Sequence, residues 1–179
     1  MNVYARYVEE ESASKAEAIF VRGNVIWADI TEGAYYPVFA VLPTDAVDKR
    51  VTWTSSNEEK ATVDKKGKVT MLNTGKVTIT GTLTSGESVS YVLNIYDPKE
   101  TTLKRPTDIE VENDQVTIEM GSYGFNPYKL IPEEGPVQSD AIFVEAEDES
   151  IVVAGPAGEL YPVSPGTTTV TVYDYISDN

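Results

Sequence analysis

Short runs of alternating apolar and polar residues follow one another along the whole chain, and no long segment repeats apolar residues at helical spacing. The pattern is densest between residues 51 and 80, where Val51 and Trp53 alternate with threonines and further runs begin at Ala61, Lys68 and Val77. This alternation has the period of a half-buried strand. Glycine and asparagine residues between the runs favour turns. The stretch is therefore predicted to form four short strands.

Similar runs flank this stretch and complete a first unit. Two strands are predicted within residues 18–30, one over residues 36–42 and a last one over residues 89–96. Residues 97–106, with prolines, charges and threonines, have the composition of a domain boundary. The predicted organisation is an N-terminal arm (1–15), a first domain (16–97), a linker (98–106) and a second domain (107–179).

The second half of the chain repeats the first half more faintly. Gly33 returns as Gly121, 88 residues later, and Gly67 returns as Gly158, 91 residues later, each within a similar local pattern. The growing offset means that a few residues have been inserted in connecting loops. A repeat with drifting loop length indicates a tandem array.

Five short motifs of the first unit follow one another in a fixed order. They are LPTDA (42–46), WTSSN (53–57), ATVD (61–64), GKV (67–69) and GKVTIT (75–80). In this order they resemble the bacterial immunoglobulin-like domain of group 2, or BIG2. The resemblance implies a β-sandwich of the kind found in adhesins, cell-wall proteins and phage virion proteins, almost always without catalysis. The predicted fold class is all-β: two tandem immunoglobulin-like (BIG2) β-sandwich domains, the second divergent and lacking its last strand.

The second unit departs from the family pattern at its most characteristic position. No tryptophan stands where Trp53 does, so either Phe143 or Val144 fills that place. The tryptophan motif itself is replaced by the acidic stretch 145–149. Trp27 and Trp53 of the first unit are both expected in its core, because aromatic side chains dominate sandwich cores.

The repeat also predicts an open sheet edge in the second unit. At the offset of 91, the strand over residues 89–96 maps onto positions 180–187, beyond Asn179. We expect this edge to be completed by strand pairing, either by the arm at residues 2–8 of the same or a neighbouring copy or by another protein. The alternatives are a different strand order or a chain cut short of its natural end. The predicted partner-binding residues are Val3, Tyr4, Arg6, Tyr7, Tyr173 and Tyr175.

Composition removes most common catalytic designs. The chain has no Cys and no His, which excludes disulfides, thiolate nucleophiles, serine–histidine catalysis and His-ligated zinc. The carboxylates of Glu145 and Glu147 would share one strand face, an arrangement that could serve glycoside hydrolysis, but paired carboxylates alone are a weak signal. Calcium is an alternative ligand for these oxygens, although no calcium-loop motif is present. The chain is predicted not to be an enzyme and to need no cofactor.

Charge is concentrated in the second half. Residues 1–104 hold 12 Lys and Arg against 14 Asp and Glu, a net charge of −2, whereas residues 105–179 hold 2 against 15, a net charge of −13. This acidity disfavours nucleic acid and anionic membrane surfaces as partners, because phosphate binding needs Lys and Arg clusters.

These features predict a non-enzymatic structural or display protein. The first N-terminal residues lack the basic start and apolar run of a secretory signal, and no apolar run is long enough to span a membrane. Together with the open edge, this favours a phage virion protein, such as a head decoration, head fibre or tail component, whose partners are other virion proteins, further copies of itself or a host surface. The alternative is a binding module of a bacterial cell-surface adhesin or carbohydrate-active protein, located outside the cell.

Overall fold

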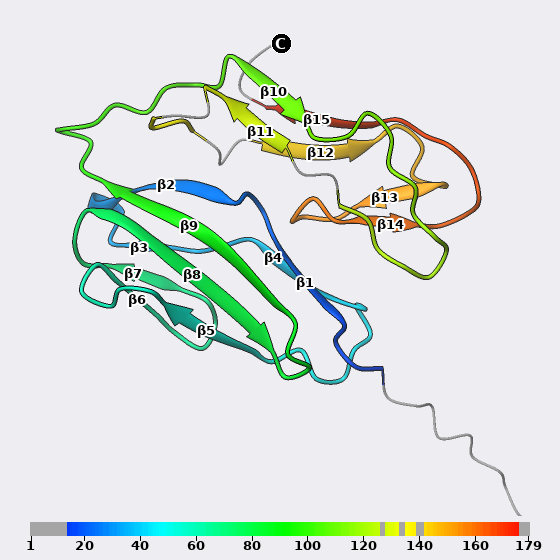
Figure 1. Ribbon diagram of the computed structural model, residues 1–179, viewed down its shortest axis with the longest axis horizontal. Coiled ribbons are helices and arrows are strands. Elements are labelled where there is room, and N and C mark those ends of the chain that lie inside the picture. The colour runs from blue at the N-terminus through cyan, green and yellow to red at the C-terminus, as the bar shows by residue number, and fades with distance from the viewer. Residues whose placement is uncertain (1–13, 126–127, 133–134, 139–141, 176–179) are drawn as a thin grey trace, which may run out of the picture.

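A computed structural model describes residues 14–125, 128–132, 135–138 and 142–175, and within them the fold is all-β (Figure 1). The only helical element among these residues is one short turn of 3-10 helix, η1 (Ile30–Glu32). The strands are β1 (Ala18–Val21), β2 (Val25–Asp29), β3 (Ala34–Tyr35), β4 (Phe39–Leu42), β5 (Val51–Ser55), β6 (Ala61–Val63), β7 (Val69–Met71), β8 (Gly75–Leu83), β9 (Ser88–Tyr96), β10 (Asp108–Val111), β11 (Tyr128–Ile131), β12 (Ile142–Ala146), β13 (Val152–Ala154), β14 (Leu160–Pro162) and β15 (Val170–Asp174). The predicted all-β class with an Ig-like β-sandwich is confirmed.

The first unit is a sandwich of two layers. One layer is the sheet β2–β9–β8–β5, and the other consists of the sheet β3–β7–β6 and the antiparallel pair β1–β4. Alternate residues of both layers point into one core, as the burial pattern of β8 shows along its whole length. The buried side chains of this core are Ala16, Ile19, Val21, Ile26, Ala28, Ala46, Trp53, Ala61, Val69, Met71, Val77, Ile79, Leu83, Tyr91, Leu93 and Ile95.

Three details differ from the sequence-based expectations. Trp53 lies in the core, but Trp27 is half-buried on the other face of β2, against the ring of Tyr96 at 6.3 Å. The strand expected over residues 36–42 is shorter, because it begins only after Pro37, which has no backbone N–H to give to a ladder. The N-terminal arm ends before Lys15, which forms a backbone bridge to the first unit.

The second unit consists of three strand pairs, β10–β11, β12–β15 and β13–β14. Two of these pairs repeat the register of the first unit 91 residues later. The ladder β6–β7 aligns Ala61 with Met71, and the ladder β13–β14 aligns Val152 with Pro162. The ladders β5–β8 and β12–β15 are related by the same offset. The faint sequence repeat therefore corresponds to repeated backbone pairing.

The register also shows what replaces the core tryptophan. Trp53 lies directly opposite Gly81, and at the same place in the second unit Val144 lies opposite Val172. Phe143 points to the other face of β12 and is 39% exposed. Of the two residues expected at this position, Val144 is the one that occupies it.

The second unit is less completely closed than the first. Strand β8 has a neighbour on each side, β5 and β9, whereas β15, its counterpart, pairs only with β12 within the described residues. Residues 113–117, which match β2 at an offset of 88, form no strand and are exposed. The buried apolar side chains of this unit are few: Val137, Ile142, Ala146, Ala157 and Leu160.

Candidate binding surface

Three aromatic rings, two of them exposed and one half-buried, form a cluster on the surface of the second unit. Phe143 on β12 lies directly opposite Tyr173 on β15, and their rings stack with centroids 6.2 Å apart. Tyr175, just beyond β15, meets the Phe143 ring edge-on at 5.9 Å and is 75% exposed. Phe143, Tyr173 and Tyr175 are called the aromatic cluster below. Exposed rings grouped in this way are unusual on a surface and typical of contact sites.

Charged groups border the aromatic cluster. Glu145 follows Phe143 by two residues on the same face of β12, where alternate side chains point the same way. Partial desolvation, and then the neighbouring Glu145 carboxylate, raise the pKa of Tyr173 above its ordinary value. From the first unit, the Arg22 guanidinium lies 4.9 Å from the Phe143 ring centroid and donates an Nε–H bond of 2.9 Å to the Pro156 carbonyl. The cluster therefore lies beside the junction of the two units.

The sequence-based site residues are partly brought together here. Tyr173 and Tyr175 both contact the Phe143 ring in the aromatic cluster. The other four predicted contact residues, Val3, Tyr4, Arg6 and Tyr7, lie outside the described residues. Sequence reasoning did not find Phe143 as a surface residue or Arg22 as its neighbour. Only the strand register, which sets Phe143 across from Tyr173, could have indicated the first of these.

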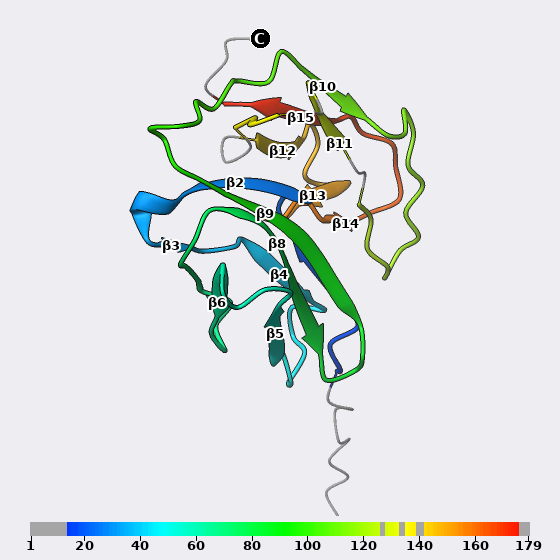
Figure 2. The same ribbon diagram turned by 60° about the vertical axis from the view of Figure 1, so that its left-hand side comes forward.

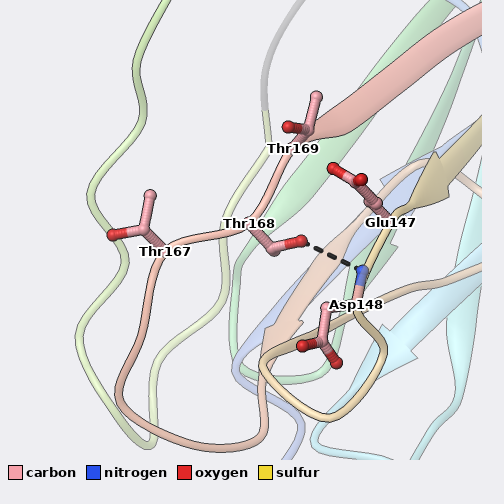
Figure 3. A pocket seen from close by; sticks show the side chains of 5 residues that line it. All are labelled: Glu147, Asp148, Thr167, Thr168 and Thr169. Atoms are coloured by element: carbon pink, nitrogen blue, oxygen red, sulfur yellow. Dashed lines mark hydrogen bonds between the residues drawn. The ribbon is translucent and has the colours of Figure 1, made fainter.

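A shallow hollow of about 490 Å³ lies at the end of β12 (Figure 3). It is lined by Glu147, Asp148 and the three threonines 167–169. The Asp148 carboxylate accepts hydrogen bonds from the Ser150 N–H (2.9 Å) and hydroxyl (2.6 Å), which lower the pKa of Asp148. These hydrogen bonds hold the Asp148 carboxylate within its own turn.

The hollow does not gather the carboxylates that a metal or a glycosidase would need. Strand β12 ends at Ala146, and Glu147 lies in the bend beyond it, where its N–H still donates a 2.9 Å hydrogen bond to the Thr169 carbonyl. Across the parts of the chain that the structure describes, no group of three or more acidic side chains is placed to hold a metal ion. The described residues therefore provide no site for the calcium ion that was considered as an alternative ligand.

A fully buried carboxylate stands at the junction of the units. Glu159 on the turn before β14 is 0% exposed, and its carboxylate accepts hydrogen bonds of 2.9 Å from the Ala157 N–H and from the Tyr161 hydroxyl. Burial, and then the hydrogen bond to Glu159, raise the pKa of Tyr161. A hollow of about 320 Å³ lies between these side chains and β4 of the first unit. These two donors explain how the buried carboxylate is tolerated.

No helix among the described residues is long and apolar enough to cross a membrane.

Comparison with known proteins identifies the first unit. The family described as "Bacterial Ig-like domain (group 2)" matches residues 36–92. An uncharacterized protein of Clostridium acetobutylicum is 28% identical over 145 residues, which cover 78% of this chain and 35% of that protein. A lacto-N-biosidase of Bifidobacterium bifidum is 42% identical over 60 residues, 34% of this chain and 5% of the enzyme. A 3-O-alpha-D-galactosyl-alpha-L-arabinofuranosidase of Bifidobacterium longum is 47% identical over 51 residues, 28% of this chain and 4% of the enzyme.

Two solved structures show some likeness. An intimin mutant from EHEC O157:H7 has 22% sequence identity and a TM-score of 0.31, and the match covers 53% of this chain and 47% of that chain. Domains 4 and 5 of the S-layer protein SbsC have 13% identity and a TM-score of 0.34, and the match covers 92% of this chain and 95% of that chain. The chain spans only part of the curated relatives that it matches. Domains of the matched family occur in extracellular and surface proteins. The motifs, the strand ladder and the family match agree that residues 36–92 are similar to the bacterial Ig-like domain (group 2).

Proposed function

We propose that the chain is a non-enzymatic contact module of a surface-exposed or extracellular protein, built from one group 2 Ig-like domain and a divergent second copy. The repeated strand register supports the second copy, because the same pairs of residues face each other at one constant offset in β5–β8 and β12–β15. The lack of His and Cys supports a role in binding, since the usual general bases and nucleophiles are missing from the sequence.

The aromatic cluster supports a carbohydrate as the ligand. The C–H face of a sugar ring is apolar and packs on exposed aromatic rings, while the sugar hydroxyls need polar groups at the edge of the same site. Phe143, Tyr173 and Tyr175 supply three adjoining rings, and the Glu145 carboxylate can accept hydrogen bonds beside them. Two relatives are glycosidases by name, and they share their similar segment with this chain over only a small part of their length. This supports a carbohydrate-associated module and not a hydrolase.

The phage virion component predicted from the sequence is the second candidate. Strand β15, which pairs only with β12 within the described residues, supports it, because virion parts assemble through repeated contacts between subunits. Immunogold labelling with antibodies against the chain would separate the two placements. Label on intact phage particles from the encoding bacterium supports the virion candidate, and label on the cell envelope or on secreted protein supports the surface module.

Glycan binding is tested by a glycan array followed by calorimetric titration of the best ligand. Replacing Phe143 or Tyr175 by Ala should weaken binding about 3- to 10-fold each, since one stacked ring contributes about 0.5–1.5 kcal/mol. Tyr36→Ala is the matched control, because Tyr36 is an exposed tyrosine (65%) on the first unit. Equal binding by all variants, or cleavage of the ligand that Glu145→Gln abolishes, would contradict the proposal.

A further inference from the structure

We propose that the aromatic cluster binds amino sugars whose nitrogen is a free ammonium, and that the Glu145 carboxylate pairs with that ammonium. This inference rests on the proposed glycan binding and names the class of glycan. An amino sugar without an acetyl group presents an apolar C–H face and a positive charge on one ring. The outer face of β12 and β15 has a complement for each of these features.

The first argument is the layout of this sheet face. Phe143 lies directly opposite Tyr173, and Glu145 lies directly opposite Thr171. Alternate side chains of a strand point to the same face, so these four residues share the outer face of the β12–β15 pair. Two residues along a strand lie about 7 Å apart, which is the scale of one sugar ring. A sugar that stacks on the aromatic cluster therefore reaches the Glu145 carboxylate with a group at its edge.

The second argument is the state of the Glu145 carboxylate. Glu145 is exposed, and among the described residues no Lys or Arg forms an ion pair with it. Its neighbour is the Tyr173 hydroxyl, whose pKa is raised by desolvation and then by the Glu145 charge. The hydroxyl is therefore protonated at neutral pH and can donate to the carboxylate without neutralising it. A carboxylate has about four acceptor sites, so positions remain for the three donors of an ammonium group.

The third argument is that the surface favours cations. The Arg22 guanidinium already lies 4.9 Å from the Phe143 ring centroid, as expected of a cation on an aromatic face. Residues 105–179 also carry a net charge of −13, which attracts cationic ligands and repels acidic ones.

The position of Arg22 orients the ligand. In both views β12 and β15 lie side by side with β2 of the first unit below them, and Arg22 precedes β2 in the chain (Figures 1 and 2). Its guanidinium repels a second cation beside Phe143. The Tyr175 ring, which is 75% exposed, is open to the sugar face, and the ammonium lies toward Glu145.

The ligand class is tested by calorimetric titration of the full chain with two oligosaccharides of equal length. One is a glucosamine oligomer, and the other is its fully N-acetylated counterpart. The amine form should bind about 5- to 20-fold more tightly, because its ammonium gains an exposed ion pair and a contact with aromatic rings. Raising the salt concentration from about 0.05 M to about 0.5 M should remove most of this preference, since salt screens exposed charges.

Two charge-removing variants assign the preference to one carboxylate. Glu145→Gln keeps the size of the side chain and removes its charge, so the two oligosaccharides should then differ in affinity by no more than about twofold. Glu149→Gln is the matched control, because it removes the same charge from an exposed turn beyond β12 and should leave the preference unchanged.

Each contrary outcome has a distinct meaning. Equal binding of the two oligosaccharides by the unchanged chain, or equal loss of the preference in both variants, overturns the amino-sugar inference and leaves glycan binding standing. The same holds if only neutral glycans bind. A chain that binds no glycan at all contradicts the proposed function itself. A lysine-rich peptide that binds as tightly as the glucosamine oligomer, with the same dependence on Glu145, also overturns the inference, because the surface would then select cationic peptides.

Discussion

The pair formed by Trp53 and Gly81 provides a quantitative test of the inference that the second unit repeats the first. A Cβ on Gly81 would lie 2.8 Å from the Trp53 ring, too close for ordinary packing, and the two residues lie directly opposite each other on β5 and β8. At the same place the second unit has Val144 opposite Val172. A large and a small residue in one unit are thus replaced by two residues of intermediate size in the other.

Each single change should be costly, and the double change should recover part of the loss. Trp53→Val leaves a cavity and should lower the free energy of unfolding by about 3 kcal/mol. No hydrogen bond is lost, because the buried Trp53 Nε1 has no partner among the described residues. Gly81→Val forces a side chain into the indole and should cost about 2 kcal/mol. Together the two changes should cost about 2–3 kcal/mol, a favourable coupling of about 2–3 kcal/mol between residues in contact.

The coupling is measured by urea unfolding of every variant, with far-UV circular dichroism as the signal. Trp27 fluorescence reports on the first unit once Trp53 has been replaced, because the sequence contains no other tryptophan. Thr82→Val is the matched control, since Thr82 adjoins Gly81 on β8 but points to the other face. Its effect should stay within about 0.5 kcal/mol and add to that of Trp53→Val. If the costs of Trp53→Val and Gly81→Val also add within about 0.5 kcal/mol, the inferred size exchange is wrong.

Three further predictions follow from the polar contacts. Hydrogen bonds from Arg50 hold the pKa of the Asp48 carboxyl below its ordinary value of 3.8, so an NMR titration should show that carboxyl still ionised at pH 3, and Arg50→Ala should raise its pKa. Tyr161→Phe should lower the free energy of unfolding by about 1–3 kcal/mol, because it removes a donor to the buried Glu159 carboxylate. Folding raises the pKa of Tyr161 above its ordinary value of 10.0, so the stabilisation from its hydroxyl is complete below pH 10 and is lost as the pH rises further. The urea midpoint should therefore fall less between pH 9 and 11 for the variant than for the unchanged protein. Arg22→Ala removes a cation over an aromatic ring and a bond to a backbone carbonyl, so it should speed proteolysis of the segment between the units, while Arg22→Lys should restore only part of the protection.

Much of the first unit was readable from the sequence because local signals agree there. Alternation over residues 51–80 predicted four strands, and β5, β6, β7 and the first six residues of β8 lie in that stretch. The glycine turns and the motif order led to the correct family. The second unit was readable only through its repeat of the first, since its own motifs have diverged.

The candidate binding surface was mostly hidden from sequence reasoning. Tyr173 and Tyr175 were expected to make contacts, but their neighbour Phe143 was weighed only as a core residue. Alternation defines two faces of a strand and does not say which face is covered, so the choice between Phe143 and Val144 needed the partner strand. The approach of Arg22 depends on how the two units pack, and no local pattern encodes that.

By itself, the sequence determined that this chain forms β-strands, that part of its pattern recurs 88 to 91 residues later, and that neither imidazole nor thiol chemistry is available to it. Strand period, turn residues and composition are local properties, and each is visible in a short window. Only the tertiary structure decided that Glu159 is buried with its own donors and that three rings meet at β12 and the end of β15. Those features depend on pairings between residues far apart in the chain, which are selected by the packing of the whole fold.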